Sequence, residues 1–268
     1  MLKHLVKYEW QACQKVLVII NAFTVFITIL GMLTITTLDY DLNSGAKSIV
    51  IFIFMMYYIT IISVAFAMSL YCAIRFYRNL YTDEGYLMHT LPVTKRQLVI
   101  SKLLIHCLCM LITELITMVS IVLLLMPLLA RLLDTPDLFL HNLLNALPEL
   151  CRSAGISLSV FILVGSVSNF IGLASGILMI YCAIILGQTF HRHKVMGSIL
   201  CYIGLYSLVQ SVTSALIMPQ TIQLGNVDFS PVDFLIHAIP TTSIASLFLG
   251  ILWYVITLHM MNKKLNLD

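Results

Sequence analysis

The chain has 268 residues, of which 60% are hydrophobic and 10% are charged, with a mean hydropathy of +0.99 and a formal net charge of +3. A soluble domain typically has about 25% charged residues, so this composition excludes a soluble protein and predicts a membrane protein. Each crossing of a bilayer needs about 20 mostly apolar residues, which allows roughly six crossings and leaves no room for a separate catalytic domain.

Residues 1–15 are predicted to form an amphipathic interfacial helix. On a helical projection Trp10 lies on an apolar face, and Lys3 and Lys7 lie on the opposite, basic face, which is typical of a helix that lies on a membrane surface. Glu9 falls within the apolar face, where an unpaired carboxylate is costly, so we expect it to have a cationic or hydrogen-bonding partner. The alternative is a frayed, solvated terminus.

Residues 16–268 are predicted to form one all-α domain of six transmembrane helices. The apolar run at 155–190 is too long for one upright crossing and too short for two, so we expect a helical extension outside its span. The six spans are placed at about 16–38, 48–74, 98–130, 168–190, 195–218 and 241–261.

Two regions between the spans are less regular. Residues 131–167 and 219–240 can be read as interfacial or re-entrant. In the second region Pro231 is expected to begin a short helix, which Pro240 interrupts before the last span.

Span three contains an acid, Glu114, roughly 20 Å beyond its start and therefore inside the hydrocarbon. An acid is expensive there, so we expect Glu114 to face another helix or a water-filled cavity and to be protonated or paired. Its role, lining a transport path or locking helices together, stays open.

Span four and its extension carry small residues at helical spacing. Such a stripe lets membrane helices approach closely, so we interpret it as a packing surface rather than a ligand site. Its members are Gly165, Asn169, Gly172, Gly176, Ala183 and Gly187.

The polar link at about 75–97 separates spans two and three. Thr82 followed by Asp83 and Glu84 predicts the start of a short helix, which Pro92 ends. Thr94 and Gln97 have the spacing of a capping box, which predicts the start of the next helix. The alternative is an ordinary solvated loop.

Basic residues determine the expected orientation. With six crossings, one side of the membrane holds both termini, the 75–97 link and the His191 to Lys194 link. The positive-inside rule makes that side cytoplasmic. It holds Lys3, Lys7, Lys15, Arg75, Arg78, Lys95, Arg96, Lys102, Arg192, Lys194, Lys263 and Lys264, leaving only Lys47, Arg131 and Arg152 opposite.

Motifs for chemistry are absent from the sequence. It has no G-x-x-x-x-G-K-[ST] phosphate loop, no H-E-x-x-H and no G-x-S-x-G, so we expect neither an enzyme nor an ATP-binding chain. His191 and His193 point far apart on a helix and are poor joint metal ligands, so no metal site is expected. The seven cysteines lie mostly in apolar runs and are expected to be packing residues.

The order of these parts resembles the membrane subunit of an ABC-2 type ABC exporter. The resemblance covers nearly the whole chain and is strongest in the D-E-G-Y-L-x-x-x-L-P-V string from Asp83 to Val93 and in the segment from Tyr181 to Lys194. Both resemble stand-alone permeases of Gram-positive bacteria. The resemblance implies a multi-pass protein of the bacterial cell membrane with both termini cytoplasmic.

In that family the link between spans two and three contains a coupling helix that docks on a separate ATP-binding subunit. The resemblance therefore implies two copies of such an ATPase, which would hold ATP and Mg, with no cofactor on this chain. The other implied partners are a second permease, which is either an identical copy or a related chain, and membrane lipid. No nucleic acid is implied as a partner. The implied docking residues are Asp83, Glu84, Gly85, Tyr86, Leu87, His89, Leu91 and Pro92.

The implied activity is outward transport of an amphiphile, which could be a peptide, a lipid-like molecule or an antibiotic. Nothing in the spans identifies the cargo. The alternative function, from a different class, is a membrane-anchored interaction or immunity protein that works without turnover.

Overall fold

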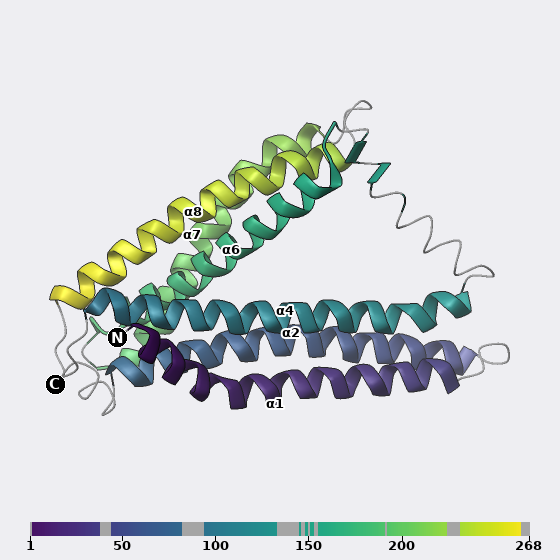
Figure 1. The fold of residues 1–268 in the computed structure, drawn as a ribbon, viewed down its shortest axis with the longest axis horizontal. Coiled ribbons are helices and arrows are strands. Elements are labelled where there is room, and N and C mark those ends of the chain that lie inside the picture. The colour runs from purple at the N-terminus through teal and green to yellow at the C-terminus, as the bar shows by residue number, and fades with distance from the viewer. Residues whose placement is uncertain are drawn as a thin grey trace. The chain divides into compact units, whose positions relative to one another are not determined.

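The described residues of the computed structural model form six long helices (Figure 1). The structure describes residues 2–37, 44–81, 94–132, 145, 148–149, 151–152, 155–190, 192–223 and 231–263. The helices are α1 (Leu2–Thr37), α2 (Ser44–Tyr81), α4 (Lys95–Leu132), α6 (Leu158–Gly187), α7 (Lys194–Gln223) and α8 (Pro231–Lys263).

All six helices are long and apolar enough to cross a membrane. They have between 30 and 38 residues, which corresponds to about 45 to 57 Å and exceeds the hydrocarbon thickness of about 30 Å. Large apolar side chains such as Phe52, Phe66 and Phe248 lie exposed along them, as lipid contact requires. Within the described residues, the predicted helical structure with six helices that could span a membrane is therefore confirmed.

Several helices extend past the predicted span limits. Helix α1 is continuous from Leu2 to Thr37. It therefore joins the predicted interfacial helix at 1–15 to the first predicted span. Helix α2 continues to Tyr81 because residues 75–81 contain no glycine or proline that would stop it. The expected extension of span four is helical and continuous with it in α6.

The predicted interruption at Pro240 is wrong, because α8 runs through it from Pro231 to Lys263. Hydroxyl groups just after the proline supply extra hydrogen bonds to the preceding turn. Thr242 Oγ1 donates to the Ala238 carbonyl at 2.7 Å, and Ser243 Oγ donates to the Ile239 carbonyl at 2.5 Å. Such hydroxyls are one of the devices that make proline tolerable inside a membrane helix.

The chain divides into two compact units. The "α1 unit" contains Lys3–Tyr71 and Leu108–Leu144, and the "α6–α8 unit" contains Met1–Leu2, Cys72–Cys107 and Asn145–Asp268. Helices α2 and α4 contribute one part to each unit.

In the α1 unit, a small apolar core is supplemented by polar contacts. One cluster of this core consists of Ile35, Tyr57 and Leu124. The Asn21 amide donates to the Leu17 carbonyl at 2.8 Å and to Thr113 Oγ1 at 3.3 Å. A hydrogen bond between membrane helices is worth about 0.6 kcal/mol on average, so this one makes a modest contribution to holding α1 on α4.

In the α6–α8 unit the three helices pack side by side, with α6 in contact with both others (Figure 1). Gly187 allows α6 to approach the start of α7 closely, since a Cβ atom there would overlap the backbone of Ser198. At Gly250 of α8, an added Cβ would lie 3.3 Å from Ser175 Cβ. The predicted use of small residues for packing therefore holds at Gly187.

Two glycines of the small-residue stripe should respond differently to an added methyl group. Gly187→Ala should destabilise the protein by about 1–3 kcal/mol through overpacking. Gly172→Ala meets no atom within 4 Å and should be neutral or stabilising by up to about 1 kcal/mol through helix propensity. Thermal unfolding of the purified variants in one detergent measures both. Equal unfolding midpoints for Gly187→Ala and Gly172→Ala would show that α6 and α7 are not tightly packed at Gly187.

Candidate functional site at the ends of α2, α4 and α6

The predicted docking residues, Asp83 to Pro92, lie outside the described residues. The structure does define the helices on either side of them. Helix α2 ends at Tyr81, and α4 begins at Lys95. The predicted capping box is confirmed, because Thr94 N donates to Gln97 Oε1 and Gln97 N donates to Thr94 Oγ1, each at 3.3 Å. The segment is therefore followed by a helix with a fixed first turn.

Tyr181 of α6 contacts both helices that flank this segment. Its ring stacks on Phe76 of α2, with ring centroids 3.7 Å apart and planes inclined by 8°. Its hydroxyl forms a hydrogen bond of 2.5 Å with Nδ1 of His106 on α4. All three side chains are fully buried. We name Phe76, His106 and Tyr181 the "junction".

The junction forms because each helix presents a buried stripe at helical spacing. On α2 the stripe is Cys72, Phe76, Asn79 and Leu80, and on α6 the buried residues run from Ile177 to Gly187 almost without a break. Positions three and four apart share one helix face, so α2 remains packed up to its last turn. The residues of α4 that are buried here are Leu98, Val99, Ser101, Lys102, Ile105 and His106.

Two of the buried residues in α4 are ionisable. Lys102 and His106 are both 0% exposed. Lys102 has an interaction partner, as a buried ammonium group requires. His106 Nε2 has no hydrogen-bond partner among the described residues. An unsatisfied buried nitrogen costs about 1–3 kcal/mol, so the junction is not optimised for stability alone.

The first turn of α4 is also attached to the end of α8. Lys95 Nζ donates to the main-chain carbonyl of Met261 at 2.7 Å. The last carbonyls of a helix lack partners within it, and a lysine can supply one. This contact joins the first turn of α4 to the last turn of α8.

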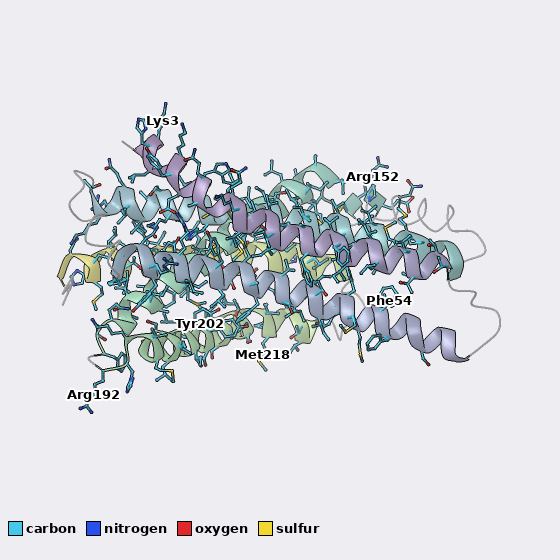
Figure 2. The ribbon with its side chains drawn as sticks, turned by 90° about the horizontal axis from the view of Figure 1, so that it is seen from below. Lys3, Phe54, Arg152, Arg192, Tyr202 and Met218 are labelled. Carbon is cyan, nitrogen blue, oxygen red and sulfur yellow. The ribbon has the colours of Figure 1, made fainter. Side chains whose placement is uncertain are left out.

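The link between α6 and α7 lies in the same unit. Ser198 Oγ donates to the Ile184 carbonyl at 3.3 Å and so joins the two helices. Arg192 and His193 are exposed, and Figure 2 shows Arg192 extending away from the helices at the start of α7. This matches the expectation of a solvated basic link.

Other predicted site residues lie elsewhere. Glu9 is 4% exposed and has a polar or electrostatic partner, as predicted, and Trp10 is half-buried. Glu114, in the α1 unit, is exposed and has no partner among the described residues. Within these residues no three His, Cys, Asp or Glu side chains gather in a way that could hold a metal ion.

Sequence reasoning missed the junction. Residues 75–97 were interpreted as one polar link because of their charges, although Cys72, Phe76, Asn79 and Leu80 already have helical spacing. That pattern could have predicted the extension of α2. Nothing local could have indicated Tyr181 as the partner, since it lies 75 residues from His106.

Comparison with protein-family models, curated proteins and solved structures gives no match for this chain. The functional argument therefore depends on the residues themselves.

The hydroxyl of Tyr181 should contribute measurably to stability. Tyr181→Phe keeps the stack on Phe76 but leaves His106 Nδ1 unpaired, which should cost about 1–3 kcal/mol. Tyr58→Phe is the matched control, because Tyr58 is 66% exposed. Thermal unfolding in detergent compares the two variants. If Tyr181→Phe and Tyr58→Phe have the same thermal unfolding midpoint, the hydrogen bond between Tyr181 and His106 does not contribute to stability.

Because Glu114 is exposed, we expect its carboxyl group to contribute little to the stability of the isolated chain. Because no described residue pairs with it, Glu114→Gln should change the stability of the isolated chain by no more than about 0.5 kcal/mol. Any larger effect should appear only in an assembled complex, measured as the amount of complex recovered from membranes. A lowered unfolding midpoint of the isolated variant would instead show that the carboxyl group holds helices of this chain together.

Proposed function

We propose that this chain is the membrane-spanning permease subunit of an ATP-driven exporter of the ABC-2 type. It docks a separate ATP-binding subunit through residues 83–92 and moves an amphiphilic substrate outward across a bacterial cell membrane. Two observations support this. The sequence of the docking segment resembles that of the family, and the chain has six helices suited to a membrane with no phosphate loop of its own.

The junction is the single observation that supports coupling best. The docking segment connects α2 to α4, so a displacement of the segment reaches both helices. Phe76 and His106, one on each helix, contact the same residue of α6, Tyr181. Packed cores transmit strain because they have few voids, whereas a solvated loop does not. Movement of the docking segment would thus be transmitted to α6 through two contacts, one from Phe76 on α2 and one from His106 on α4.

The partner ATPase, in two copies, holds ATP and Mg in this proposal. This chain supplies the docking surface, the rigid connection and the path through the membrane. A second permease, identical or related, completes the assembly, and both termini face the cytoplasm.

The test is copurification of this chain with a candidate ABC ATP-binding subunit, together with export by each variant. Tyr86→Ala removes an aromatic anchor from the proposed docking surface. Truncation of such anchors can cost 2 kcal/mol or more, about a thirtyfold loss of affinity. Gly85→Pro should have a larger effect if Gly85 lies beyond the first turn, because proline kinks a helix and removes a donor.

The control must be an exposed residue near the segment. Lys95 is unsuitable because it donates to Met261, whereas Arg96 is exposed. Arg96→Ala should therefore keep nearly full copurification, because rim charges contribute little. Normal copurification and normal export in both Tyr86→Ala and Gly85→Pro would mean that the segment is a solvated connector and would refute the proposal.

A further inference from the structure

Between α6 and α8 lies a hollow with a volume of about 320 Å³. Its wall is uncharged, and it combines hydroxyl groups and one amide with a larger apolar surface. The residues that matter for the argument are Ser168, Asn169 and Gly172 of α6 and Thr242, Ser243 and Ser246 of α8. No ionisable side chain lines it.

The hollow lies near the start of the predicted spans at 168–190 and 241–261. Its residues fall within the parts of α6 and α8 that could span a membrane. Gly172 is roughly 21 Å along α6 from its start at Leu158, on the opposite half of the helix from Tyr181. Phe170 and Ile244 next to the hollow are exposed, so its edge is apolar.

Hydrogen-bonding groups in the hollow lack partners. Asn169 is exposed, and its side chain makes no hydrogen bond to the described residues. Its amide has two donors and an acceptor, and these groups are free to pair with a polar group of a ligand. The hydroxyls of Thr242 and Ser243 donate to their own helix and retain free acceptor positions.

The small residues here keep space open instead of bringing helices together. A Cβ atom added at Gly165 or Gly172 would meet nothing within 4 Å. At Gly187, on the same stripe, it would overlap Ser198. The stripe predicted from the sequence therefore has two functions along its length, and only the Gly187 end is a tight helix contact.

We propose that this hollow binds a lipid-like, uncharged amphiphile that carries an amide or hydroxyl group next to an apolar chain. The polar group would pair with Asn169 and the serine hydroxyls, and the chain would lie along the exposed apolar edge. A charged group would find no counter-charge in the wall. The volume is near the lower end of the range of about 300–1,000 Å³ for ligand pockets, which suits the polar part of such a molecule. That this ligand is the cargo rests on the proposed function.

The test uses the purified chain in phosphatidylcholine vesicles, because that lipid has neither an amide nor a hydroxyl group. The probe is a photoactivatable ceramide, and a photoactivatable phosphatidylcholine with the same reactive chain is the control probe. Mass spectrometry maps the labelled residues. We expect ceramide label to concentrate on residues 165–172 and 239–246.

Three variants test the assignment. Asn169→Leu removes the amide and should lower ceramide labelling about fivefold, the equivalent of one net hydrogen bond. Gly172→Leu fills the hollow and should lower it at least as much. Gly204→Leu is the matched control, because Gly204 is exposed on α7 and a Cβ there also meets nothing within 4 Å. It should label like the unaltered chain.

Equal ceramide labelling in all variants, or equal labelling by both probes, would overturn the inference. So would a crosslink between two copies at Asn169, which would show that a helix fills the hollow. Copurification with the ATPase is measured on the same chains to separate the two proposals. Absent labelling with intact copurification overturns only the site, and labelling without copurification overturns only the proposed function.

Discussion

The hydrocarbon core of a bilayer supplies no hydrogen-bond partners, and this constraint determines most of what the chain does. Helices pair their own backbone groups, so they are the natural form for its apolar runs. Hydroxyl side chains follow the same rule, as Thr28 shows by donating to the Thr24 carbonyl at 2.7 Å. Proline inside α8 is tolerated because neighbouring hydroxyls support the weakened turn. Among the described residues, His106 Nε2 and the side chains of Glu114 and Asn169 are examples of polar groups without a hydrogen-bond partner, and such groups in a membrane helix point to a function.

Helix α6 combines two kinds of surface in one element. Its second half is buried on nearly every side, contacts α2 and α4 through Tyr181 and touches α7 at Gly187. Its first half is largely exposed and lines an uncharged hollow with α8. In the two proposals made above, this helix connects the proposed docking segment near one end with the proposed ligand site nearer the other. A rigid connection of this kind suits a transporter that must link two distant events.

Much of the fold could be predicted because membrane helices have strong local signals. The six apolar runs, the capping box at Thr94 and Gln97 and the extension of α6 agree with the structure. Six of the seven cysteines are buried and all are free, which agrees with their expected packing role. The errors came from giving local polar or proline signals too much weight. Charges at Arg75 and Arg78 concealed the end of α2, and Pro240 does not break α8.

The sequence by itself determined that the chain is helical, apolar and multi-pass, because length and hydropathy of a run are properties of adjacent residues. Only the tertiary structure decided which faces meet. Tyr181 finds Phe76 and His106 across long stretches of chain, and no spacing rule links them. It also decided that the small-residue stripe is tight at Gly187 and open at Gly172. Both positions have the same side chain, so only the distance to the neighbouring helix, which packing sets, can distinguish them.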